Sequence, residues 1–247
     1  MGQCQCSTGS DCGGPRGSAP LPPLHGIPED RDISLWRLPG GPWLGDDSCT
    51  LHGGKDTGET QPVFAFLSSA ATARNATVIL GAHNIHEPET TQQIRGVLGY
   101  YQHPAYDPNT VSNDIMLLKL TAKATLNDYV KTIPLPKTSS DLPTGTKCSI
   151  AGWGLIDDDQ TTNKLFETKV SIYSRRKCIH FYPHLNTGMV CAGSFHELRD
   201  SSQGDSGGPL VCNKVAQGIV SFGYDTPPGV YTRISNYLRW IKRTLKK

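Results

Sequence analysis

Short runs of apolar residues recur along the chain beyond residue 60, and glycine and proline are frequent in the segments between them. Each run is only four to seven residues long, which is the length of a buried strand rather than of a helix. The candidate strands are residues 62–67, 77–80, 114–120, 148–154, 218–223 and 229–234. Many short strands with Gly and Pro between them predict an all-β fold.

The pattern changes at the two ends of the chain. Between residues 234 and 245, apolar side chains recur at helical spacing and lysines follow, which predicts a C-terminal helix. Residues 1–48 are rich in Gly, Pro and Ser with little periodicity, which predicts a disordered or linker-like head. We therefore expect a low-complexity head over residues 1–48 and one folded domain over residues 49–247.

The composition is that of a globular protein, with 36% hydrophobic and 19% charged residues in a chain of 247. A formal net charge of +2 implies no general attraction to nucleic acid or to an anionic membrane. No apolar run is long enough to span a bilayer. We expect no nucleic-acid partner, no membrane span, and no metal or cofactor.

Eight cysteines fall into two groups of four, one in or just beyond the head and one in the folded part. Four well-spaced cysteines in a β-rich domain indicate disulfides and an oxidising compartment. Residues 1–35 contain no charged-then-apolar pattern of a signal peptide. We therefore expect that this head is not the native start of a secreted protein.

The densest chemical motif is Gly204-Asp205-Ser206-Gly207-Gly208-Pro209-Leu210, which packs an acid, a hydroxyl and three glycines into seven residues. Glycine is needed where the backbone adopts a positive φ or approaches another group closely. A serine in such a turn can present its hydroxyl outward while backbone N–H groups point inward. That is the geometry of a nucleophile beside an oxyanion hole. A Gly-rich surface turn is the alternative interpretation.

The motif at residues 204–210 resembles the nucleophile motif of the trypsin/chymotrypsin family of serine proteases. Segments at residues 51–56 and 81–85 are similar to those of its granzyme and mast-cell protease branch. The resemblance covers roughly residues 50–247. It implies a chymotrypsin-like fold of two six-stranded antiparallel β-barrels with a C-terminal helix. We expect the first barrel to be incomplete, because part of its sequence pattern is missing.

The resemblance also implies roles in peptide-bond hydrolysis. Ser206 would be the nucleophile, and the backbone N–H groups of Gly204 and Ser206 would hold the oxyanion. Asp114 would be the carboxylate that orients the base. Ser221, just ahead of Phe222, matches the family serine that lines the substrate strand.

The histidine base of this family is absent from its expected window, residues 67–75, where Ala71 occupies its place. An alternative is that the whole histidine-bearing segment is missing. His83, His86 and His103 are the nearest histidines, and we expect none of them to act as the base. Loss of the triad histidine costs about 10⁶ in kcat, roughly 8–9 kcal/mol of barrier.

The primary specificity pocket has three candidate residues. Asp200, six residues before Ser206, matches the acid that floors this pocket in the trypsin branch, which implies a preference for Arg or Lys. Gly223 and Gly229 match wall positions that must be small to admit a long side chain. Because Ser202 replaces the cysteine of the branch's pocket disulfide, Asp200 as a plain surface acid is the alternative.

Disulfide pairing follows from the same resemblance. It pairs Cys148 with Cys212 and Cys178 with Cys191, and each bridge is expected to contribute about 2–4 kcal/mol.

Activation in this family pairs a new N-terminal amine with the carboxylate that precedes the nucleophile, here Asp205. The aligned start at residues 50–53 follows Cys49, with no basic residue beside it. A buried carboxylate without a partner is costly. We therefore expect Asp205 to turn outward and to leave the oxyanion hole unformed.

These observations favour a serine-type endopeptidase family member that is impaired because its histidine is absent. Its expected partners are protein or peptide substrates and serine protease inhibitors, its expected state is a monomer, and its expected location is secreted or in a secretory granule. One alternative is a catalytically inactive pseudoprotease that acts as a binding module. Another is an incomplete, mis-spliced product.

Overall fold

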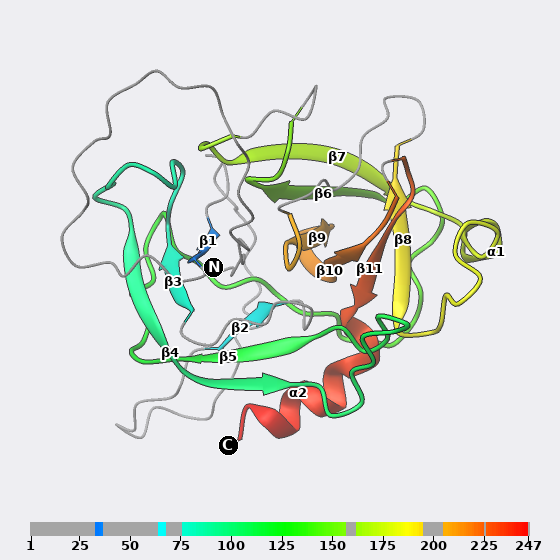
Figure 1. Ribbon diagram of the computed structural model, residues 1–247, viewed down its shortest axis with the longest axis horizontal. Helices are drawn as coiled ribbons and strands as arrows, with labels where there is room; N and C mark the ends of the chain where they lie inside the picture. Colours follow the sequence, from blue (N-terminus) through cyan, green and yellow to red (C-terminus); the bar gives the residue numbers. More distant parts are fainter. Residues whose placement is uncertain are drawn as a thin grey trace.

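The structure is a computed structural model that describes residues 76–156, 162–194, 205–224 and 226–246, together with the backbone of strands at Ile33–Trp36 and Phe64–Leu67. An open five-stranded sheet and a closed six-stranded barrel lie side by side (Figure 1). The predicted all-β fold with an incomplete first barrel is confirmed. In these described ranges, no helix is long and apolar enough to cross a membrane.

The open sheet has the strand order β1-β3-β4-β5-β2. Its strands are β1 (Ile33–Trp36), β2 (Phe64–Leu67), β3 (Thr77–Leu80), β4 (Gln93–Gln102) and β5 (Met116–Leu120). β1 pairs with β3 in parallel, whereas the other pairs are antiparallel. β1 lies inside the head of residues 1–48, so these four residues depart from the predicted lack of structure there. The rest of the head lies outside the described residues.

The closed barrel follows the strand order β10-β11-β8-β7-β6-β9. Its strands are β6 (Lys147–Gly152), β7 (Phe166–Ile172), β8 (Met189–Gly193), β9 (Pro209–Cys212), β10 (Val215–Phe222) and β11 (Gly229–Arg233). A short helix, α1 (Arg175–Cys178), interrupts the chain between β7 and β8. Figure 1 shows this helix at the outer edge of the barrel.

β5 is buried on both faces, which explains its nearly continuous apolar sequence. Met116, Leu118 and Leu120 belong to the core of the open sheet. Leu117, with the preceding Ile115, packs instead into the core shared with the barrel and the C-terminal helix. The start of β5 therefore lies at the junction of the two halves.

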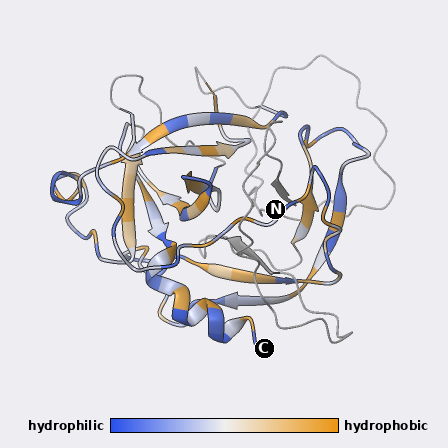
Figure 2. Ribbon diagram, turned by 180° about the vertical axis from the view of Figure 1, so that it is seen from behind, coloured by the Kyte–Doolittle hydropathy of each residue, from blue (hydrophilic) through white to orange (hydrophobic). Residues whose placement is uncertain are grey.

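The predicted C-terminal helix begins as a 3₁₀ turn, η2 (Ile234–Tyr237), and continues as α2 (Leu238–Thr244). Figure 2 shows apolar and polar residues in alternating bands along it, as an amphipathic helix requires. Ile234 and Ile241 are buried against the shared core, which holds the helix beneath both halves.

Both predicted disulfides are present. Cys148–Cys212 joins β6 to β9, where the two residues are also directly paired in the ladder. Cys178–Cys191 joins the end of α1 to β8. All four cysteines are buried, so the two bridges lie inside the second half of the molecule.

Candidate functional site

Ser206 occupies an exposed position in a tight turn just before β9. The N–H of Gly208 donates a hydrogen bond of 2.8 Å to the carbonyl oxygen of Asp205, which closes a four-residue turn. Gly207, the third residue of that turn, has φ of +85°. A positive φ at this position is the requirement of a type II turn, and glycine meets it without strain. The glycine of the motif therefore has the backbone role that its sequence predicted, and the turn presents Ser206 to solvent.

Asp114 lies at the junction of the two halves, immediately before Ile115 and β5, and is only 1% exposed. Its Oδ2 accepts a hydrogen bond from the hydroxyl of Ser221 on β10. Its main-chain carbonyl accepts a second hydrogen bond, of 2.6 Å, from Oγ1 of Thr232 on β11. The structure thus brings together two of the predicted site residues, Asp114 and Ser221, which sequence places 107 residues apart.

The electrostatic effect of Asp114 extends to two tyrosines. Burial raises the pKa of Tyr237, and the negative charge of Asp114 raises it further. Burial likewise raises the pKa of Tyr106, and the charges of Asp114 and Asp107 add to that rise. Both phenols therefore stay protonated well beyond neutral pH.

Asp205 does not turn outward, so the expectation for its side chain is wrong. The carboxylate is half-buried, and its Oδ1 accepts a hydrogen bond of 2.8 Å from the N–H of Gly154. A Cβ atom on Gly154 would lie 2.6 Å from the carboxylate carbon, and one on Gly152 would also collide with it. Gly152 and Gly154 therefore leave space for the Asp205 carboxylate. The N–H of Gly154 gives that carboxylate a hydrogen-bond donor that sequence reasoning overlooked.

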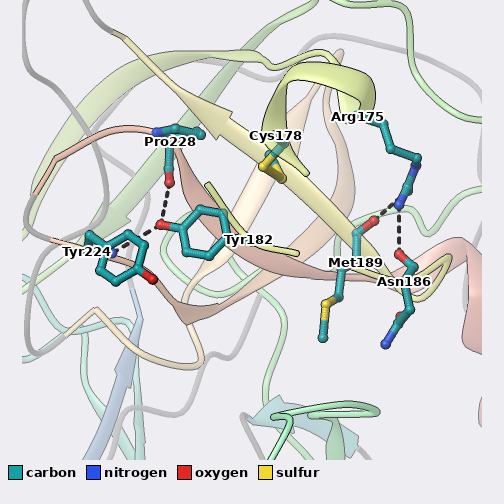
Figure 3. Close-up of a disulfide and its surroundings, with 8 residues drawn as sticks. Arg175, Cys178, Tyr182, Asn186, Met189, Tyr224 and Pro228 are labelled. Atoms are coloured by element: carbon teal, nitrogen blue, oxygen red, sulfur yellow. Dashed lines mark hydrogen bonds between the residues drawn. A yellow bond between two sulfur atoms is a disulfide. The ribbon is translucent and has the colours of Figure 1, made fainter. Parts of the chain in front are cut away.

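Two tyrosines that sequence reasoning missed, Tyr182 and Tyr224, lie beside Gly223 and Gly229, the predicted pocket-wall glycines. The hydroxyl of Tyr182 donates a hydrogen bond of 2.8 Å to the carbonyl of Pro228 and accepts one of 3.1 Å from the N–H of Tyr224 (Figure 3). The rings of Tyr182 and Tyr224 are stacked, with centroids 5.0 Å apart and planes 11° apart.

The two glycines of this wall face each other closely. A Cβ atom on Gly223 would lie 3.3 Å from the Cα of Gly229, so a side chain at this position would press against the backbone of Gly229. Gly223 is exposed and Gly229 is buried.

Three of the predicted site residues, Gly204, Ala71 and Asp200, lie outside the described residues. The structure therefore describes the turn at Ser206 and the Asp114–Ser221 pair. The oxyanion donor at Gly204, the position of the base and the pocket floor stay predictions.

His103 and His83, which the sequence analysis considered as alternative bases, make contacts that belong to the fold. The ring of His103 lies 5.3 Å from that of Tyr237 and 5.1 Å from that of Trp240, and burial lowers its pKa. The main chain of His83 is a hydrogen-bonded part of the fold, because its carbonyl accepts a bond of 3.0 Å from the indole of Trp153. Over the ranges that the structure describes, no cluster of His, Cys, Asp and Glu could hold a metal ion.

Comparisons with known proteins agree with this fold. Residues 67–241 match the family model for trypsin. Duodenase-1 of Bos taurus is 44% identical over 188 residues, which cover 74% of this chain and 75% of the relative. Granzyme B of Homo sapiens is 41% identical over 191 residues, 74% of this chain and 76% of the relative. A solved structure, "Structure of GrC", has a TM-score of 0.71 and 37% identity, covering 76% of this chain and 85% of that chain.

Proposed function

Because the chain belongs to the trypsin family of serine proteases, in a branch similar to granzymes and mast-cell proteases, we propose that it carries an impaired serine endopeptidase site. Ser206 is the nucleophile of this site, Asp114 is its orienting carboxylate, and the N–H groups of Gly204 and Ser206 are its oxyanion donors. The missing part is the base, because residues 67–75 contain no histidine.

The observation that carries the proposal is the hydrogen bond from Ser221 to the buried carboxylate of Asp114. A buried carboxylate with a side-chain donor is the partner that a histidine base needs in order to keep its orientation. Ser206 stands in an exposed glycine turn, as an attacking hydroxyl must. Without the base, nothing removes its proton during attack, and kcat falls by about 10⁶ relative to a complete triad.

The substrates of the site are peptides with Arg or Lys before the scissile bond. Asp200 supplies the carboxylate for this recognition, and Gly223 and Gly229 keep the pocket wall small. Protein substrates and serine protease inhibitors are the partners, and the chain acts as a monomer. Two disulfides support folding in an oxidising, secretory compartment.

A pure binding module is the second candidate, and the ordered wall around Tyr182 favours it. The hydrogen bonds of Tyr182 to Pro228 and Tyr224 fix the wall without any contribution from the base. Such a chain would hold basic peptides and never cleave them.

The test compares hydrolysis of an arginyl peptide by the wild-type chain and by Ala71→His, with Ala71→Gln and Ala71→His/Ser206→Ala as matched controls. We expect Ala71→His to raise kcat by several orders of magnitude only while Ser206 is present. Binding of an aryl amidine, lost in Asp200→Asn, reports the pocket independently of turnover. Hydrolysis by the wild-type chain at the rate of a complete triad would refute the impaired site. Amidine binding with no gain from Ala71→His would favour the binding module.

A further inference from the structure

The outer edge of the barrel, at α1 and the residues that follow it, combines exposed cations with exposed apolar side chains. Arg176 and Lys177 are exposed on α1. Ile179 is 42% exposed and Phe181 is 43% exposed just beyond it. We call these four residues the α1 edge. Figure 1 shows that α1 projects outside β8, away from the open sheet.

The α1 edge is strongly cationic although the whole chain carries a net charge of only +2. Residues 168–194 contain four Lys and Arg residues and no Asp or Glu. Arg175 is committed to the fold, because its guanidinium donates bonds of 2.7 and 2.6 Å to the carbonyls of Asn186 and Met189 (Figure 3). The carboxylate of Asp141 lies 3.7 Å from the same guanidinium and offsets its charge.

Arg176 and Lys177, the two cations of the α1 edge itself, are available to a partner. Among the residues that the structure describes, neither Arg176 nor Lys177 belongs to an ion pair. His180 and His184, on the same loop, are also exposed. The exposed edge therefore presents a positive field with no acidic neighbour of its own segment.

The α1 edge is held rigidly from beneath. The Cys178–Cys191 disulfide ties the end of α1 to β8. The N–H groups of Phe181 and Tyr182 each donate a bond of 2.9 Å to the carbonyl of Cys178, which fixes the loop that carries the apolar side chains. The ring of Phe181 also meets that of Tyr173 edge-on, with centroids 6.4 Å apart. Binding a partner at this surface loses little conformational entropy, because the loop is already fixed in the free protein.

The combination of cations and exposed apolar side chains fits an anionic lipid surface better than a soluble polyanion. Anionic lipid headgroups attract Lys and Arg near the membrane surface, while apolar side chains enter the boundary with the acyl chains. A polyanion in solution would use the cations and leave Ile179 and Phe181 in water. We propose that the α1 edge docks the folded domain onto anionic lipid membranes. This inference does not depend on the activity of the Ser206 site.

The first measurement is co-sedimentation of the full, disulfide-bonded chain with vesicles of phosphatidylcholine, with and without about 30% phosphatidylserine. We expect binding only to the anionic vesicles, weakened by salt because the attraction is screened. Arg176→Gln/Lys177→Gln should lower the partition coefficient on the order of 20-fold, since each cation near such a surface contributes about fivefold. Phe181→Ser should lower it by roughly fivefold to tenfold.

Control variants test whether vesicle binding depends on the α1 edge or on positive charge anywhere on the surface. Arg239→Gln/Lys242→Gln removes two exposed cations from α2 and should leave vesicle binding unchanged. Phe181→Trp should retain binding, and brominated acyl chains should quench its fluorescence beyond the background of the four native tryptophans. Equal losses from the α1 and α2 variants, or unchanged binding in Phe181→Ser, would overturn the proposal. Binding to heparin with none to anionic vesicles would overturn it as well.

Discussion

The hydroxyl of Ser221 donates a hydrogen bond to the carboxylate of Asp114, across the junction between the open sheet and the closed barrel. Asp114 is 1% exposed, and a carboxylate removed from water in this way is costly unless donors surround it. The main chain of the same residue accepts a hydrogen bond from Thr232. The aspartate is therefore both a part of the candidate site and a structural link between the two halves.

Removing this carboxylate should destabilise the fold. Asp114→Ala leaves the Ser221 hydroxyl without its acceptor, and we expect a loss of about 1–3 kcal/mol in the free energy of unfolding. Asp114→Asn keeps an oxygen for Ser221 and should cost less. Urea denaturation measures both, with Asp128→Ala as a control because that side chain is 95% exposed. Equal stability of Asp114→Ala and Asp128→Ala would contradict the structural role.

Gly154 should tolerate no side chain while Asp205 is present. The Cβ of Gly154→Ala would lie 2.6 Å from the Asp205 carboxylate, and we expect a cost of about 1–3 kcal/mol from overpacking. In an Asp205→Ala background the clash disappears, so the same substitution should cost much less. A double-mutant cycle on unfolding free energies measures this coupling. Additive effects would show that the carboxylate does not occupy the space between the glycines.

The two disulfides should differ in their contribution to stability. Cys148–Cys212 closes a loop of sequence separation 64, and Cys178–Cys191 one of only 13. The chain-entropy relation gives about 4 kcal/mol for the longer loop and about 3 kcal/mol for the shorter one. Paired Cys→Ala variants, compared by thermal melting under oxidising conditions, should follow this order. A larger loss from the shorter loop would contradict the entropic account.

Glu89 should make the fold sensitive to acid. Burial alone would raise its pKa, but hydrogen bonds from the N–H groups of His83 and Asn84 and from the Gln92 side chain outweigh burial, so the pKa lies below its ordinary 4.5. A carboxyl whose pKa is lower in the folded state stabilises the fold above pH 4.5, and this contribution is lost as the pH falls through the folded value.

The corresponding measurement is melting temperature as a function of pH. Glu89→Gln should flatten the decline of melting temperature below about pH 4.5, while Glu87→Gln, an exposed neighbour, should not. Parallel curves for the wild-type chain and Glu89→Gln would contradict this expectation. They would show that the hydrogen bonds to the Glu89 carboxylate do not stabilise the fold.

The sequence located strands β2, β3, β5, β6, β10 and β11, and it missed β1, β4, β7, β8 and β9. β5 was predictable because both of its faces are buried, although Asp114 lies before the strand rather than in it. β4 was not predicted, because Ile94 and Leu98 are exposed and two glycines interrupt the pattern. Its pairing with β3 on one side and β5 on the other stabilises it, and neither contact is visible locally.

The candidate site was predictable only where the local sequence around a residue indicates its backbone conformation. The glycines around Ser206 predict a residue with positive φ, and in the structure Gly207 has one. The inward direction of Asp205 depends on an N–H group about fifty residues away, which no local pattern near the motif reveals. Tyr182 was missed for the same reason, because its partner Pro228 is 46 residues distant.

The most direct test of the account is covalent labelling of the purified, disulfide-bonded chain with a fluorophosphonate probe. Labelling requires an activated serine hydroxyl, and in the proposed site Ser206 has its turn and the Asp114 carboxylate but no base. We expect the wild-type chain to be labelled no faster than Ser206→Ala, and Ala71→His to be labelled measurably faster. Rapid labelling of the wild-type chain that disappears in Ser206→Ala would contradict the account, because it would show that a base is present.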